Sequence, residues 1–193
     1  ITQLELENAI IVGFSMGGGE VVRYCTDYGT DKIAKAALIS SIIPLVKQKD
    51  DNPSGVPEKD LLGIKDALEN DRVGFLKEFS KGFYNYEENK DKISQAQLDY
   101  DFIVASHASP RGTIEAAKAW MHTDFRDELK NVDVPTLIIH GDADNIVPIE
   151  TSAKQAAEGI ANNKFHIIKD APHGLNITHK EELNNLLIKF LEE

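Results

Sequence analysis

The 193 residues, 41% of them hydrophobic, suffice for one globular domain with a buried core, which excludes a disordered or fibrous chain. The formal net charge of −11 disfavours nucleic acid as a partner, and we expect a small ligand that is not strongly anionic. No apolar run approaches the roughly 20 residues of a membrane span, so we expect no membrane partner. The single cysteine, Cys25, indicates a reducing compartment and predicts a cytoplasmic protein.

The first elements of the chain predict a strand, a sharp turn and a helix. Residues 2–6 look like the end of a helix, and residues 8–14 (NAIIVGF) form a short β-branched apolar run that is typical of a buried strand. Val21, Val22 and Cys25 then recur at helical spacing, up to a turn signal near Gly29.

Three further apolar runs predict strands, at residues 33–43, 134–140 and 164–169. Helical patterns occupy residues 150–161 and 178–191, after the third and fourth predicted strands. Strands that alternate with helices indicate an α/β fold, with a mostly parallel sheet and helices on both faces. Ligands of such folds bind at the carboxyl ends of the strands.

Residues 44–121 contain no run that predicts a buried strand. This segment is polar, has a turn-rich stretch at residues 51–55, and then carries apolar residues at helical spacing. We therefore predict a helical lid inserted into the core. Residues 1–43 would form the first part of that core and residues 122–193 its C-terminal part.

Ser15 lies in the pattern G-x-S-x-G, residues 13–17 (GFSMG), between the first predicted strand and helix. That context is the one in which a strained turn exposes a nucleophilic serine. Two other interpretations exist: the serine could only cap the helix, or the loop could bind phosphate. A Walker-type loop lacks its lysine, because Gly19 follows Gly18, and a dinucleotide loop would need glycine in place of Ser15.

A nucleophilic serine needs a base and a group that orients the base. The third predicted strand runs into a loop with Asp142 and Asp144, and the fourth into a loop with His173. Parallel strands bring these loops to the same edge as Ser15, and the order Ser, Asp, His is the order that this fold uses. Either aspartate could instead be an ordinary turn residue. No pair of histidines has metal-ligand spacing, and we expect no metal.

Several motifs together resemble the α/β-hydrolase fold, and within it the cofactor-free haloperoxidase and aryl esterase branch. They cover nearly the whole chain: GFSMGGGEVVRY (residues 13–24), DDNPSG (50–55), GFYN (82–85), TDFR (123–126), HGDADNIVP (140–148) and APHG (171–174). The resemblance implies that Ser15 is the nucleophile and His173 the general base and acid. It implies Asp144, three residues after Gly141, as the orienting acid, and the backbone N–H of Met16 as an oxyanion donor.

The resemblance also implies the activity. Members of the branch hydrolyse carboxylic esters through an acyl-enzyme, and many let hydrogen peroxide replace water, without haem, metal or another cofactor. The ligand would be a small-molecule ester or carboxylic acid, and the enzyme a homo-oligomer. Phe79, Trp120 and Ile146 would line the acyl pocket, although core packing explains them equally well.

The α/β-hydrolase fold normally places several strands, and a loop with a second oxyanion donor, before the nucleophile strand. We therefore expect a complementary N-terminal segment of the same protein as a partner of this chain. The alternative, from a different class of function, is a noncatalytic fragment or ligand-binding module that has lost its oxyanion loop.

Overall fold

Four parallel strands form a single sheet in the order β1-β2-β3-β4 in the computed structural model, which describes residues 1–193. The strands are β1 (Ala9–Phe14), β2 (Ile33–Ile39), β3 (Thr136–Gly141) and β4 (Asn163–Ile168). The predicted parallel sheet is therefore confirmed. The strands lie side by side in their chain order, so their carboxyl ends follow one another from β1 to β4 along one edge of the sheet.

The second strand is shorter than predicted. It ends at Ile39, because Ser40 takes a φ of 45° and leaves the extended conformation. Ile42 and Ile43 are nevertheless buried, as loop residues that pack into the core. Their burial explains why the apolar run continues beyond the strand.

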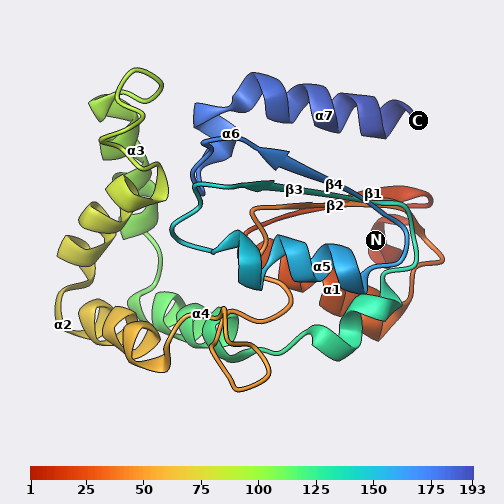
Figure 1. Cartoon of the computed structure of the whole chain (residues 1–193), viewed down its shortest axis with the longest axis horizontal. Helices are drawn as coiled ribbons and strands as arrows, with labels where there is room; N and C mark the ends of the chain where they lie inside the picture. Colours follow the sequence, from red (N-terminus) through yellow and green to blue (C-terminus); the bar gives the residue numbers. More distant parts are fainter.

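Helices cover both faces of the sheet (Figure 1). Alternate residues of β2 face opposite sides: Ala36 and Leu38 join the cluster that contains α1 (Met16–Tyr28) and α5 (Ala153–Gly159), whereas Ala37 and Ile39 join the cluster that contains α7 (Lys180–Glu192). Full burial of a side chain as large as Leu38 or Ile39 contributes about 1.5 to 3 kcal/mol to stability. The core thus consists of two layers, one on each side of the strands.

The lid segment is helical, as predicted, and contains α2 (Glu58–Phe83), α3 (Gln95–Ser106) and α4 (Pro110–His122). These helices lie beyond the carboxyl ends of the strands (Figure 1). The helix α2 has one non-helical residue, Asp71, where its two halves meet. The loop before α2 is held by buried Asn52, whose amide donates to the Leu45 carbonyl and to Thr151 Oγ1.

Other helical predictions need small corrections. The 150–161 pattern is a 3-10 turn, η3 (Ile149–Thr151), followed by α5, and the 178–191 pattern begins two residues later as α7, after the short α6 (Leu175–Thr178). Residues 2–6 hold only a 3-10 turn, η1 (Thr2–Leu4), and another such turn, η2 (Arg126–Asn131), follows α4. None of the helices combines the length and apolar character that crossing a bilayer requires.

Candidate active site

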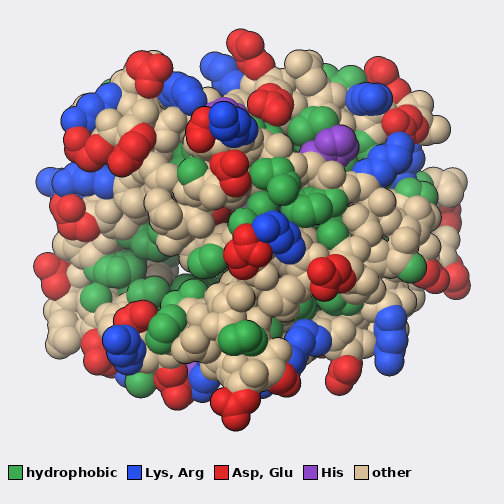
Figure 2. Space-filling view, viewed as in Figure 1, with side chains coloured by type: hydrophobic (Ala, Val, Ile, Leu, Met, Phe, Trp, Pro, Cys, Tyr) green, Lys and Arg blue, Asp and Glu red, His purple; other side chains and the backbone are tan.

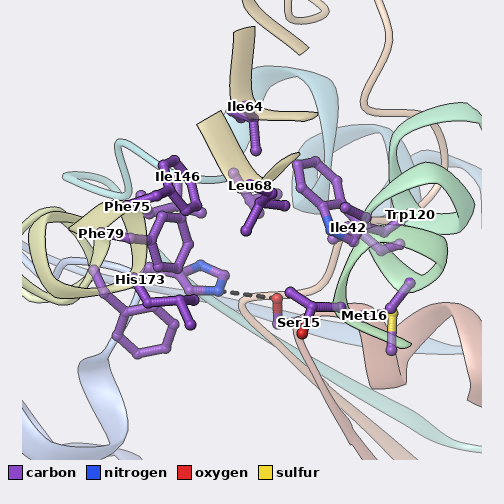
Figure 3. A pocket seen from close by; sticks show the side chains of 16 residues that line it. Ser15, Met16, Ile42, Ile64, Leu68, Phe75, Phe79, Trp120, Ile146 and His173 are labelled. Atoms are coloured by element: carbon purple, nitrogen blue, oxygen red, sulfur yellow. Dashed lines mark hydrogen bonds between the residues drawn. The ribbon is translucent and has the colours of Figure 1, made fainter. Parts of the chain in front are cut away.

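Ser15 lies on the turn between β1 and α1, with a φ of 53° and a ψ of −118°. A non-glycine residue in this region carries strain of about 1 to 3 kcal/mol, and such residues cluster at functional sites. The side chain makes no capping hydrogen bond to α1. Instead, Ser15 Oγ lies 2.9 Å from His173 Nε2 (Figure 3), so the capping interpretation is wrong.

His173 follows β4 and is 1% exposed. Its ring packs against two aromatic side chains, with ring centroids 5.3 Å from Phe14 and 4.8 Å from Phe83. Its carbonyl accepts a hydrogen bond from Ser40 Oγ. Contacts from β1, the β2 loop and the lid therefore fix the imidazole in front of Ser15.

Asp144 lies on the loop after β3, and its side chain is fully buried. One carboxylate oxygen, Oδ2, lies 2.7 Å from His173 Nδ1. The other, Oδ1, accepts hydrogen bonds from the backbone N–H groups of Ile146 and Val147, at 2.9 and 2.8 Å. The structure thus brings Ser15, His173 and Asp144 into one hydrogen-bonded series, in the order that a serine nucleophile requires.

Asp142, the other aspartate of this loop, makes no hydrogen bond or ion pair with His173. Its Oδ1 accepts a hydrogen bond from the backbone N–H of Asp170, at 2.6 Å. This bond joins the loop after β3 to the loop after β4. Asp142 therefore shapes the loops that carry the other two side chains.

Burial by itself would raise the pKa of Asp144, but hydrogen bonds from His140 and His173 outweigh it and lower this pKa from 3.8 to about 2. Asp144 is therefore an anion at neutral pH. It accepts the Nδ1 proton of His173 and leaves Nε2 free to accept the proton of Ser15.

We expect ionised Asp144 to stabilise the fold, with a defined pH dependence. A folded-state pKa of about 2 against an ordinary 3.8 means that this contribution is complete above about pH 4 and is lost as the pH falls toward 2. The free energy of unfolding of the wild type, measured with urea at several pH values, should approach that of Asp144→Asn across this window. A difference that stays constant from pH 5 to pH 2 would contradict the assignment.

A cavity of about 290 Å³ opens above Ser15 and His173. Figure 2 shows hydrophobic side chains around a hollow between α2 and α4, and Figure 3 shows the lining from close by. All three side chains that the resemblance implied for the pocket, Phe79, Trp120 and Ile146, line it. No carboxylate, lysine or arginine does.

The sequence interpretation missed the last turn of α2. Phe83 contacts the His173 ring, and its carbonyl accepts a hydrogen bond from the Gly174 N–H. The Asn85 amide donates to the Ala143 carbonyl at 2.7 Å. This end of the lid is therefore fastened to the loops of both Asp144 and His173. The only signal in the sequence was the GFYN motif. It placed these residues in the lid but did not indicate that they contact the loops of Asp144 and His173.

Comparisons with known proteins show the family of the chain. A family model described as the alpha/beta hydrolase fold matches residues 1–180. The chain belongs to the α/β-hydrolase family. Among curated relatives of this α/β-hydrolase, a putative non-heme chloroperoxidase of Synechocystis sp. is 42% identical over 193 residues, which cover all of this chain and 70% of the relative. A bifunctional esterase/perhydrolase of Acinetobacter calcoaceticus is 33% identical, with 99% of this chain and 70% of the relative covered.

A solved structure supports the same placement. The bromoperoxidase from Bacillus anthracis superimposes with a TM-score of 0.96 at 44% identity, over all of this chain and 70% of that one. The α/β-hydrolase described here is thus an enzyme of the non-haem haloperoxidase and esterase branch. The structure holds no group of three or more histidine, cysteine or acidic side chains arranged for a metal ion.

Proposed function

We propose that this chain is a serine hydrolase that cleaves carboxylic esters through an acyl-enzyme on Ser15. The observation that carries the proposal is the series of short contacts from Ser15 Oγ to His173 Nε2 and from His173 Nδ1 to Asp144 Oδ2 at the base of an apolar cavity. The names of the relatives support the class of reaction.

The first half of the reaction acylates Ser15. Its Oγ attacks the ester carbonyl carbon while His173 Nε2 takes the hydroxyl proton, and Asp144 stabilises the imidazolium that forms. Met16 begins α1, and N–H groups in the first turn of a helix have no intrahelical partner, so its N–H is the proposed donor to the oxyanion. His173 then returns the proton to the leaving alcohol as the ester bond breaks.

The second half releases the acyl group. Water gives up a proton to His173 and attacks the acyl carbon; as the bond to Oγ breaks, His173 passes this proton to Ser15 Oγ and a carboxylic acid leaves. Hydrogen peroxide in the place of water gives a peracid by the same exchange. The peracid, bromide and a proton then yield the carboxylic acid and hypobromous acid away from the protein.

The apolar lining favours esters with uncharged acyl groups. An anion in this cavity would meet no lysine or arginine, and burying an unpaired charge is costly. Apolar groups are instead accepted at about 0.8 kcal/mol per methylene buried.

Trp120 is expected to limit the length of the acyl group. It lines both the catalytic cavity and a second hollow along α1 and α4, so Trp120→Ala should join the two spaces. The ratio of kcat/KM for p-nitrophenyl octanoate to that for the acetate should rise by about tenfold. Trp120→Phe keeps a ring in the wall and should preserve the wild-type ratio. A ratio that Trp120→Ala leaves unchanged would show that the acyl chain lies elsewhere.

The test of the proposed function is detection of the acyl-enzyme. The full chain is mixed with p-nitrophenyl acetate, quenched with acid within milliseconds and analysed by peptide mass spectrometry. We expect an acetyl group on the peptide that contains Ser15, and hydrogen peroxide should speed its loss and yield peracetic acid. Binding of the ester without acetylation or turnover would favour the alternative of a noncatalytic binding module.

A further inference from the structure

A second histidine contacts the carboxylate that orients His173. His140 is the penultimate residue of β3, and its side chain is completely buried. Its Nε2 lies 2.9 Å from the Val147 carbonyl oxygen and 3.2 Å from Asp144 Oδ2. The other ring nitrogen, Nδ1, is buried without any hydrogen-bond partner.

These contacts determine where the His140 proton lies. Two oxygen atoms that can only accept hydrogen bonds face Nε2, so a lone pair on Nε2 would be repelled by both. A proton on Nδ1 would instead be a buried donor without an acceptor, which is costly. The imidazole therefore carries its proton on Nε2, which faces the Val147 carbonyl oxygen at 2.9 Å and Asp144 Oδ2 at 3.2 Å.

We propose that His140 is a positioning residue for catalysis, whose Nε2–H holds Asp144 Oδ2 in place and shares this oxygen with His173. The inference rests on the proposed function, because it assigns a role within the same series of hydrogen bonds. The Asp144 carboxylate then has four N–H neighbours: Oδ1 accepts two backbone hydrogen bonds, and Oδ2 lies 2.7 Å from His173 Nδ1 and 3.2 Å from His140 Nε2. The low pKa of Asp144 is consistent with this arrangement, since the contacts with His140 and His173 both lower it.

The second donor has two chemical consequences. It fixes the rotation of the carboxylate, and therefore the direction of the hydrogen bond that sets the His173 tautomer. The N–H of His140 also neutralises part of the negative charge on Oδ2. Asp144 therefore stabilises the protonated form of His173 less than it would without His140. Loss of the donor should thus slow turnover and, at the same time, make His173 hold its proton to a higher pH.

Few titratable groups surround the imidazole of His173, so a change in its protonation can be attributed to His140. His173 lies on the β4 loop and pairs with Asp144 from the β3 loop, and Asp144 in turn contacts His140 from β3. The residues that contact the His173 ring from β1 and α2 are Phe14 and Phe83, which do not titrate.

The experiment compares His140→Leu, which has no donor, with His140→Gln, whose amide nitrogen can take the place of Nε2. His166→Gln, at an exposed position on the neighbouring strand β4, is the matched control. For His140→Leu we expect kcat on p-nitrophenyl acetate to fall by about tenfold. The acidic limb of its kcat/KM profile should move up by about half a pH unit. His140→Gln should recover most of both effects, and His166→Gln should match the wild type.

A second readout needs no turnover and keeps this test separate from that of the proposed function. The proton between His173 Nδ1 and Asp144 gives a low-field NMR resonance. This resonance should move in His140→Leu and return toward its wild-type position in His140→Gln. The same changes are expected when Ser15→Ala is also present, because the measurement needs no catalysis. If His140→Leu does not fold, His140→Asn, whose amide is too short to reach Asp144, takes its place. The inference would be overturned if His140→Leu lowered only the melting temperature and left the resonance and the pH profile unchanged. It would also be overturned if His140→Gln behaved like His140→Leu.

Discussion

Ser15→Ala is expected to lower kcat/KM for p-nitrophenyl acetate by about 10⁴-fold or more. Alanine has no atom that can attack the carbonyl carbon, and His173 then has no hydroxyl to deprotonate. The fold should persist, because the only hydrogen bond of the Ser15 side chain is the one to His173. Initial rates, with circular dichroism to verify folding, measure the effect.

The matched control for this prediction is Ser54→Ala, at an exposed serine in the loop before α2. It should retain wild-type rates and covalent labelling by a fluorophosphonate, whereas Ser15→Ala should lose both. Esterase turnover that survives in Ser15→Ala would refute the nucleophile assignment. It would also refute the acyl-enzyme mechanism built on it.

Gly13→Ala is expected to destabilise the fold by about 3 kcal/mol or more. A Cβ atom at Gly13 would lie 2.4 Å from the Gly17 carbonyl oxygen and 2.6 Å from the Gly18 nitrogen. Both are backbone atoms at the start of α1, so no side-chain rotation relieves the overlap. The helix would have to move away from β1, and Ser15 would move with it. Urea denaturation should show the loss of stability, and kcat should fall as well.

Gly17→Ala provides the comparison within the same motif. Apart from the adjacent residues and the backbone of α1 itself, no atom lies within 4 Å of a Cβ at Gly17, which lies in the first turn of α1. Alanine there should be neutral or stabilise the fold by up to about 1 kcal/mol. The two glycines of G-x-S-x-G would thus differ: the first is required by close packing, the second is not. Equal destabilisation by both substitutions would contradict this distinction.

The sequence could bring the loops of the candidate site together for a topological reason. Buried parallel strands leave strong apolar runs, and their carboxyl ends meet at one edge, so Ser15, His173 and the loop that holds both aspartates could be placed together without any packing detail. The distances of 2.9 and 2.7 Å are what the structure adds.

Contacts between distant segments could not be predicted in this way. Phe83 reaches His173 from the far end of a lid helix, and the contact leaves no periodic signal in the sequence. His140 looked like the ordinary end of a strand, because only the turn at Asp144 brings the carboxylate back to its ring. The choice between Asp142 and Asp144 rested on resemblance for the same reason: two turn residues so close in sequence point in different directions only once the loop is folded.

The lining of the cavity also bears on how the catalytic cycle ends. In the proposed reaction, a neutral ester enters a space that offers apolar contacts and no lysine or arginine. Hydrolysis would turn it into a carboxylate, which would find no counter-charge there, within a protein of net charge −11. The same side chains that retain the substrate would therefore expel the product. Carboxylic acids should accordingly inhibit only weakly at neutral pH, and more strongly as acidification makes them neutral.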